Sequence, residues 1–356
     1  MPAVNHRSAR LVAALLAAIA APCLAADSQW PLSVIIVDES GSMKNRDAPQ
    51  WLEENLIDSA GSTAIMYGLV AFSESARVVD SGAGTLWPAD GLAAGFAELD
   101  LTRGVEDGLA AVRFALDEFG VFPDAAPHYL LVSDEDRDIV DAGVDVAELG
   151  EALTSAGAVL DAMLSVSLRC GRERALGLAR DGVAWVADGR GGFRTCEGGY
   201  VQNLVNSPVR DYVTLALGSG GTVWDIGMAG WRVDGKHYPA LDSPRRSSAS
   251  AAWAAAAKAQ WKRRLDAPLI ARAYASRLMT TVGGVVELDA TRSYSRDASR
   301  DIAQIDWLVD GELVSAGESA ALVAERPGPM RITLRVTDSG FPPRVSEDVV
   351  TVWVFE

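Results

Sequence analysis

The chain has few of the side chains that most often carry catalysis or bind metals through nitrogen and sulfur. Its 356 residues include 3 histidines and 3 cysteines. It contains no His-Glu-x-x-His pair, no Gly-x-Ser-x-Gly elbow and no phosphate-binding loop ending in Gly-Lys-Ser or Gly-Lys-Thr. These absences argue against a zinc peptidase, a serine hydrolase and a nucleotide hydrolase. We therefore predict that the protein is not an enzyme.

Positive charge is also scarce in this sequence. Lys and Arg together number 32 against 48 Asp and Glu, which gives a formal net charge of −16. A chain with this charge is repelled by nucleic acids and by anionic membrane surfaces, so neither is an expected partner. The acidic composition is compatible with cation binding.

Long hydrophobic runs are absent except near the N-terminus. Arg7 and Arg10 precede a short apolar run, Leu11–Ala21, and small residues follow at Ala25 and Ala26. The run is too short to span a bilayer, and this order of features is typical of a secretory signal peptide. We therefore assign residues 1–26 to a cleaved leader and expect a secreted or periplasmic protein without a membrane span. Cys23 allows a lipid anchor instead, although its neighbour Pro22 fits such a site poorly.

Removal of the leader would leave two cysteines, Cys170 and Cys196. In an oxidising compartment an even number of cysteines favours a disulfide, which here would close a loop of about 25 residues. A metal site built on these two thiols would need further ligands, and the only histidines outside the leader are His128 and His237. We therefore predict a Cys170–Cys196 disulfide.

Residues 27–265 alternate between buried-strand and amphipathic-helix patterns. The strand patterns lie at residues 32–39, 64–72, 77–79, 128–133, 159–168 and 222–226, and the helix patterns at 49–58, 102–119, 146–156, 207–217 and 247–265. Strands that alternate with helices predict an α/β fold with a doubly wound, mostly parallel sheet.

The pattern changes after Pro268. Residues 276–356 contain short runs of alternating apolar and polar residues, separated by turns such as Asp310-Gly311 and Pro342-Pro343. Such spacing predicts a small all-β sandwich domain. Residues 266–275 are expected to form the linker between the two domains.

Oxygen-bearing side chains follow two of the predicted strands and precede one helix. Asp38, Ser40 and Ser42 come directly after the apolar run at 34–37, Asp134 follows the run at 128–133, and Thr102 stands at the start of the helix pattern at 102–119, where we expect a loop at the same edge. The carboxyl ends of parallel strands meet at one edge of a sheet, where ligands bind. Carboxylate and hydroxyl oxygens without sulfur or imidazole suit a hard cation such as Mg²⁺.

In the order of its elements and in these five positions, the segment from about residue 30 to 265 resembles a von Willebrand factor type A (vWA) domain with a metal-ion-dependent adhesion site (MIDAS). The resemblance implies that Ser40 and Ser42 bind Mg²⁺ directly, with Mn²⁺ or Ca²⁺ as alternatives. Thr102 would bind directly or through water, and the two aspartates mostly through water. It also implies cell adhesion or another protein-binding role, in which the partner offers an acidic side chain to the metal.

Two features depart from the usual pattern of that family. Asp100 and Leu101 stand where a glycine pair often precedes the threonine, and Asp134 opens an acidic run that extends to Asp138. The extra carboxylates of that run could bind a second cation such as Ca²⁺ or repel an acidic partner. We favour a simpler interpretation, in which the run is a solvated acidic loop without a specific role.

The C-terminal segment resembles a PKD-type or related immunoglobulin-like domain. The resemblance is carried by Val285–Ala290, by Ile305–Gly311 with its tryptophan, and by Arg331–Asp338. It implies that Trp307 is a core residue between two sheets and that the domain acts as a spacer or adhesion surface.

Two other functions stay open from the sequence. The first is a structural secreted protein in which a metal only stabilises the fold. The second is a metal-dependent hydrolase, which would have to use Ser40 or Ser42 without a recognisable base nearby.

Overall fold

The computed structural model describes residues 32–45, 52, 65–80, 85–88, 91–120, 127–135, 137–204, 209–229, 231–233, 236–238, 244–297 and 299–356. The leader expected at residues 1–26 lies outside this part of the chain, as does the helix expected at 49–58 apart from Leu52. Within the described residues, no helix combines the length and apolar character that crossing a membrane requires.

The first domain is built on a sheet whose central strands are parallel, which confirms the predicted fold class. In the described part of the chain this sheet has 10 strands, in the order β11-β10-β9-β13-β6-β5-β1-β2-β3 with β4 paired to β2. The parallel strands are β1 (Leu32–Asp38), β2 (Met66–Phe72), β5 (His128–Ser133), β6 (Val159–Leu164) and β13 (Thr222–Asp225). The antiparallel strands at the edges are β3 (Ala76–Val78), β4 (Leu86–Trp87), β9 (Gly177–Ala179), β10 (Ala184–Ala187) and β11 (Phe193–Cys196).

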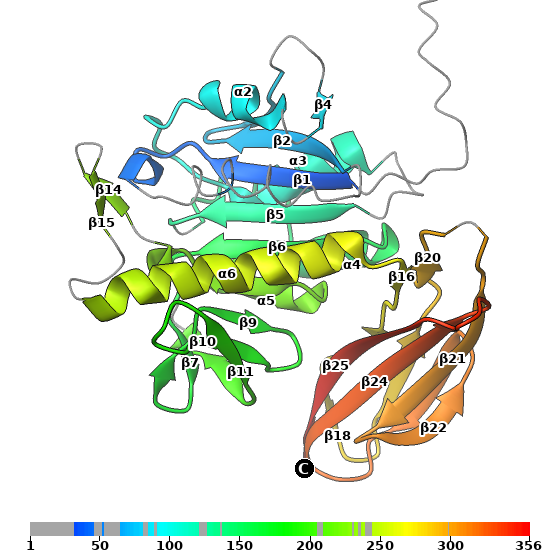
Figure 1. Cartoon of the computed structure of the whole chain (residues 1–356). Helices are drawn as coiled ribbons and strands as arrows, with labels where there is room; N and C mark the ends of the chain where they lie inside the picture. Colours follow the sequence, from blue (N-terminus) through cyan, green and yellow to red (C-terminus); the bar gives the residue numbers. More distant parts are fainter. Residues whose placement is uncertain are drawn as a thin grey trace, which may run out of the picture.

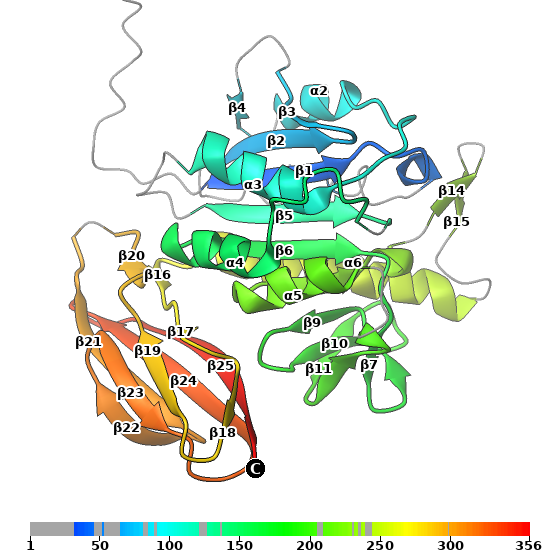
Figure 2. The ribbon, with the colours of Figure 1, turned by 180° about the vertical axis from the view of Figure 1, so that it is seen from behind.

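Helices cover both faces of this sheet. One face carries α3 (Gly108–Phe119), α4 (Val146–Ser155) and α5 (Arg210–Gly218), and Figure 2 shows them side by side. The other face carries α2 (Leu92–Ala97) and the long α6 (Pro244–Asp266), which runs roughly along the strands in Figure 1. Every residue of β1 is buried, because both faces of that strand are covered. This double burial explains why the strand reads as a continuous apolar run rather than as an alternating one.

The helix predicted at 102–119 begins six residues later than expected, at Gly108. The Asp107 side chain accepts a hydrogen bond from Ala110 N at 3.2 Å and so caps the N-terminus of α3. Residues 102–107 are therefore a loop at the sheet edge. Two short 3-10 helices, η1 (Met43–Asn45) and η5 (Ile226–Met228), follow β1 and β13.

A disulfide-bonded excursion follows β6. The strands β7 (Leu168–Cys170), β8 (Glu173–Arg174) and β12 (Gly199–Val201) form a small sheet, and β9 to β11 extend the main sheet. The predicted disulfide between Cys170 and Cys196 is confirmed. A separate hairpin pairs β14 (Trp231–Val233) with β15 (Lys236–Tyr238).

Reduction of this disulfide is expected to destabilise the α/β domain by about 3 kcal/mol, because the open chain regains the entropy of the closed loop. Guanidinium unfolding with and without a phosphine reductant measures the difference. The double variant Cys170→Ser/Cys196→Ser is the control, since its unfolding midpoint should not respond to the reductant. Equal midpoints for the wild-type protein in both conditions would contradict the expectation.

The second domain is a β-sandwich. One sheet contains β17 (Tyr274–Ala275), β19 (Val285–Asp289) and β23 (Ser319–Val323). The other contains β18 (Met279–Thr281), β21 (Ile302–Val309), β22 (Glu312–Ala316), β24 (Gly328–Asp338) and β25 (Val345–Phe355). Trp307 is fully buried in the core of this domain and donates a hydrogen bond from Nε1 to Gly317 O at 3.0 Å.

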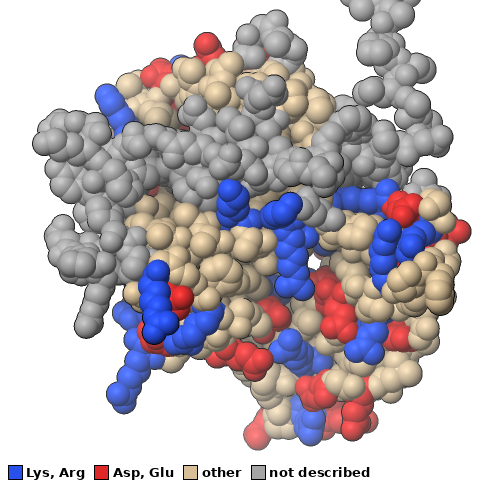
Figure 3. Space-filling model, in the orientation of Figure 1, with Lys and Arg blue, Asp and Glu red and all other residues tan. Residues whose placement is uncertain are grey.

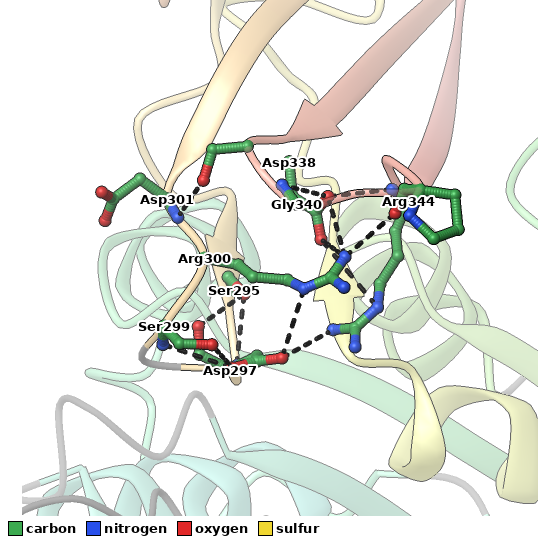
Figure 4. A network of polar contacts seen from close by, with 10 residues as sticks. Ser295, Asp297, Ser299, Arg300, Asp301, Asp338, Gly340 and Arg344 are labelled. Carbon is green, nitrogen blue, oxygen red and sulfur yellow. Dashed lines mark hydrogen bonds and ion pairs between the residues drawn. The ribbon is translucent and has the colours of Figure 1, made fainter.

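The segment expected to be a linker pairs with this second domain. β16 (Leu269–Ile270) lies antiparallel to β20 (Tyr294–Ser295), and β17 lies antiparallel to β19. A network of hydrogen bonds and ion pairs lies at the same edge of the second domain, as Figure 4 shows. In it the Asp338 carboxylate accepts hydrogen bonds from Arg344 N at 2.9 Å and Arg300 Nη1 at 3.2 Å. These arginines neutralise the carboxylate, so the network has a structural role.

The β-sandwich contacts the α/β domain near the ends at which the parallel strands begin (Figure 1). Arg180 makes the contact: its Nε donates to Val349 O at 2.8 Å, and its Nη2 lies 2.9 Å from Asp348 Oδ2. The opposite edge, where the parallel strands end, therefore stays clear of the second domain.

Candidate metal centre

Asp38 ends β1 at the carboxyl edge of the sheet, where it is fully buried. One carboxylate oxygen accepts a hydrogen bond from Ser40 N at 2.7 Å, and the other accepts one from Ser133 Oγ at 2.7 Å. The parallel register places Val37 opposite Val132, so Ser133 on β5 lies beside Asp38 on β1. These two bonds fix the aspartate and bend the chain into the loop that carries both serines.

Two serines and the second aspartate form a continuous hydrogen-bonded row. Ser42 Oγ donates to Asp134 Oδ1 at 2.6 Å, and Ser40 Oγ lies 2.8 Å from Ser42 Oγ. A hydroxyl has one proton, so Ser40 is the donor in the second bond. Ser40 is buried, whereas Ser42 and Asp134 are half-buried, so the row leads from the interior to the surface. Four of the five predicted ligand residues are therefore brought together.

Thr102 lies on the neighbouring loop, but its hydroxyl is directed elsewhere. Backbone bonds join the two loops, from Gly41 N to Arg103 O at 2.9 Å and from Arg103 N to Glu39 O at 3.1 Å. Thr102 Oγ1 donates to Asp100 Oδ1 at 2.5 Å. The proton of Thr102 Oγ1 is therefore used on Asp100, and within the described residues the threonine side chain makes no hydrogen bond to the other four.

Glu39 is a positioning residue that the sequence analysis missed. Its side chain is almost completely buried and accepts hydrogen bonds from Arg77 Nη2 at 2.6 Å and from Asp100 N at 2.8 Å. It thus connects the serine loop, β3 and the threonine loop. The sequence did not reveal this contact, because nothing in it links Glu39 to Arg77, which lies 38 residues later. Ser133 was also missed, although its position before Asp134 at the end of a strand could have suggested it.

The acidic run after Asp134 is folded against the start of α3. Arg137 is 11% exposed, and its Nε donates to Asp107 Oδ1 at 2.9 Å. The backbone of Asp138 donates from N to Glu106 O at 2.7 Å. The acidic run is therefore held in place by contacts of Arg137 and Asp138, whereas a fully solvated loop would lack such contacts. Asp136 lies outside the described residues.

The site repels further negative charge. Burial raises the pKa of Asp38, and the nearby charge of Asp134 adds to the effect, while hydrogen bonds from Ser133 and Ser40 oppose it. Burial likewise raises the pKa of Glu106 to about 7, with further contributions from the charges of Asp38, Asp138 and Glu135. A cation bound at this edge would lower the pKa of both carboxyl groups, because it favours their charged forms.

Glu106 makes stability depend on pH when no divalent cation is present. Its pKa rises from an ordinary 4.5 to about 7 in the folded protein, so its contribution is complete below pH 4.5 and is lost as the pH rises through 7. Urea unfolding in EDTA at pH 4.5 and pH 8 should therefore show a smaller decrease for Glu106→Gln than for the wild-type protein. An equal decrease in both proteins would show that another group is responsible.

The side chains present fit a hard cation better than a soft one. Among the described residues, no group of three or more His, Cys, Asp or Glu side chains is arranged to hold a metal. The candidate centre instead combines two carboxylates with two serine hydroxyls, and a third hydroxyl lies on the adjacent loop. An all-oxygen set with few charges is typical of Mg²⁺ sites that retain water molecules.

Comparisons with known proteins give structural matches only. No family model and no curated protein matches the chain. A protein described as von Willebrand factor type A from Catenulispora acidiphila is 17% identical, with 92% of this chain and 67% of that chain covered and a TM-score of 0.42. Proximal thread matrix protein 1 from the mussel byssus, described with a zinc-occupied MIDAS motif, is 14% identical over 39% of this chain and 38% of that chain, with a TM-score of 0.30. These scores are too low to carry an argument about function.

The strand order β3-β2-β1-β5-β6-β13 and the oxygen-bearing loops at its carboxyl edge agree with the resemblance to vWA domains. The α/β domain is similar in fold to a vWA domain. The second, all-β domain is similar to the fibronectin(III)-like modules of Clostridium thermocellum CbhA, at 18% identity over 24% of this chain and 97% of that chain, with a TM-score of 0.21. The vWA domain thus carries the candidate metal centre at the edge opposite the β-sandwich.

Proposed function

We propose that this chain binds a partner protein through a divalent cation, preferably Mg²⁺, held at the carboxyl edge of the vWA sheet. One observation carries the proposal: the row from Ser40 through Ser42 to Asp134, with Asp38 buried beside it. Hydroxyls joined by hydrogen bonds to a carboxylate can turn their lone pairs to a cation. The protein is proposed to be exported, since its disulfide suits an oxidising compartment.

In this proposal Ser40 and Ser42 bind the cation directly, and Asp38 and Asp134 balance its charge, mostly through water. Because few carboxylates would touch the cation, it would stay electrophilic enough to gain from an incoming acidic side chain. Thr102 would bind the cation directly or through water, and its hydroxyl can keep its hydrogen bond to Asp100 while an oxygen lone pair faces the cation.

The charge around the site makes the proposed binding depend on the metal. Asp38, Glu106, Glu135 and Asp138 gather at this edge, where burial raises the pKa of Glu106 and the charges of the other three raise it further. A partner carboxylate would meet the same repulsion in the absence of a cation. Chelation should therefore abolish binding rather than merely weaken it.

An apolar rim beside the centre supplies a second contact for the partner. Val105 is 38% exposed, Ile139 67% and Val140 50%. The two loops that carry them are joined by the bond from Asp138 N to Glu106 O. Exposed apolar side chains grouped beside a binding site are typical of protein interaction surfaces. We therefore propose a partner segment in which an acidic residue is flanked by apolar ones.

Selection from a displayed random peptide library tests this function without a known partner. Peptides are captured by the full chain in Mg²⁺ and eluted with EDTA. The expected peptides share an Asp or Glu next to apolar residues, and Ile139→Asp should weaken their binding at least tenfold without changing the Mg²⁺ affinity. If Mg²⁺ stabilises the protein but no peptide is released by EDTA, the metal serves the fold alone and the proposed function is wrong.

A further inference from the structure

A cleft of about 530 Å³ lies between the two domains, at the end of the sheet opposite the candidate metal centre. Its lining includes the arginines Arg180, Arg263, Arg264, Arg272 and Arg344 and the acids Asp181, Glu347 and Asp348. Figure 3 shows Lys and Arg side chains on both sides of the junction between the domains. Such a concentration of arginine stands out in a chain whose net charge is −16.

The acids that line the cleft are already paired with arginines. Asp348 Oδ2 lies 2.9 Å from Arg180 Nη2, and Glu347 Oε1 lies 2.7 Å from Arg335 Nε. Asp181 is 3.8 Å from Arg331, which lies outside the cleft lining. The positive charge of Arg263 and Arg272 is therefore not cancelled by the acids of the cleft.

Arg272 is the least satisfied of these arginines. Among the described residues its Nε is buried without a hydrogen-bond partner, and its Nη1 reaches only Ala271 O at 3.5 Å. Burial lowers the pKa of Arg272, the charge of Arg264 adds to this effect, and the charge of Asp348 opposes it. A guanidinium nevertheless keeps its proton in proteins, so Arg272 brings a positive charge to the cleft, while the nearby Asp348 is already paired with Arg180.

Arg264 presents a second unused donor in the same cleft. Its Nη2 lies 3.3 Å from Asp161 Oδ1, but that oxygen also accepts the bond from Thr222 N at 2.7 Å. The Nε of Arg264 is buried and has no partner within the described residues. Arg264 and Arg272 thus line one cleft together with the exposed Arg263, and each has an N–H donor without a partner among the described residues.

We infer that this cleft binds a small molecule that carries a phosphate or sulfate group. Guanidinium groups bind the oxygens of such anions through several N–H donors at once. Arg263 and Arg264 belong to α6, whereas Arg272 lies between β16 and β17 of the β-sandwich. The bound anion would bridge the two domains and fix their relative orientation.

Binding of inorganic phosphate and sulfate to the full chain tests this inference, with EDTA present so that the metal centre stays out of the measurement. The melting midpoint should rise saturably with phosphate or sulfate but not with acetate or chloride at equal ionic strength. Arg272→Gln should weaken phosphate binding at least tenfold. Arg326→Gln is the matched control, because Arg326 is 80% exposed on the β-sandwich and should leave the affinity unchanged.

Two further readouts keep the test decisive. If Arg272→Gln does not fold, Arg263→Gln replaces it, and this exposed rim variant should weaken phosphate binding several-fold. Hydrogen exchange of residues 268–275 and 344–349 should slow when phosphate binds. No saturable response to phosphate or sulfate, or an equal response in the arginine variants and the control, would overturn the inference. The Asp134→Asn variant should bind phosphate normally, which separates this site from the metal centre.

Discussion

Asp134→Asn is expected to abolish the stabilisation of the vWA domain by Mg²⁺. The side chain accepts the bond from Ser42 Oγ at 2.6 Å and is the second of the two carboxylates at the site. Asparagine keeps the shape of the side chain but removes the negative charge that would balance the cation. At a Mg²⁺ concentration 100 times the dissociation constant, a bound ion stabilises the native protein by about 2.7 kcal/mol. Urea unfolding in Mg²⁺ and in EDTA measures this difference.

Asp138→Asn is the matched control for that experiment. Asp138 belongs to the same acidic run, but its side chain is exposed and bonds to Glu106 N at 3.3 Å rather than to a serine. Its variant should keep nearly the whole response to Mg²⁺. If the two variants respond alike, the cation is bound by the acidic run in general and not by the predicted residues.

Trp307→Ala is expected to destabilise the β-sandwich by about 3–5 kcal/mol. Trp307 is fully buried, and its Nε1 donates to Gly317 O at 3.0 Å. The substitution leaves both a large cavity and an unpaired carbonyl group. Circular dichroism during urea unfolding of the full chain should show the β-sandwich transition at much lower denaturant, with the transition of the vWA domain shifted far less.

Trp353→Ala provides the matched control in the same domain. Trp353 lies on β25 and is 54% exposed, so its replacement creates no internal cavity. The expected change is below about 1 kcal/mol. A comparable loss of stability in both variants would mean that Trp307 does not anchor the core.

The fold was largely predictable because the sequence patterns reflect burial directly. The continuous apolar run of β1 indicates a strand covered on both faces, and the alternating residues of β24 indicate a strand with one exposed face. The start of α3 was misplaced because residues 102–107 continue the apolar spacing while Asp107 caps the helix. Spacing alone does not reveal where a side chain ends a helix.

The proximity of four candidate ligand residues was predictable, whereas their contacts were not, and their binding of a metal stays a prediction. Asp38 and Asp134 lie together because β1 and β5 are adjacent parallel strands that end at the same edge. The bond from Thr102 to Asp100 and the burial of Glu39 depend on side-chain rotamers and on the path of a loop. The interdomain cleft depends on how two separately folded domains pack, which no local pattern encodes.

Titration of Mn²⁺ into the metal-free chain, followed by electron paramagnetic resonance of the free ion, measures whether the chain binds a divalent cation through the serine hydroxyls. The wild-type protein should remove one Mn²⁺ per chain from solution, and added Mg²⁺ should release it. Ser42→Ala should weaken this binding at least tenfold, because it removes a hydroxyl ligand without changing the charge. Equal uptake of Mn²⁺ by the wild-type protein and by Ser42→Ala would show that the Ser42 hydroxyl does not bind the cation.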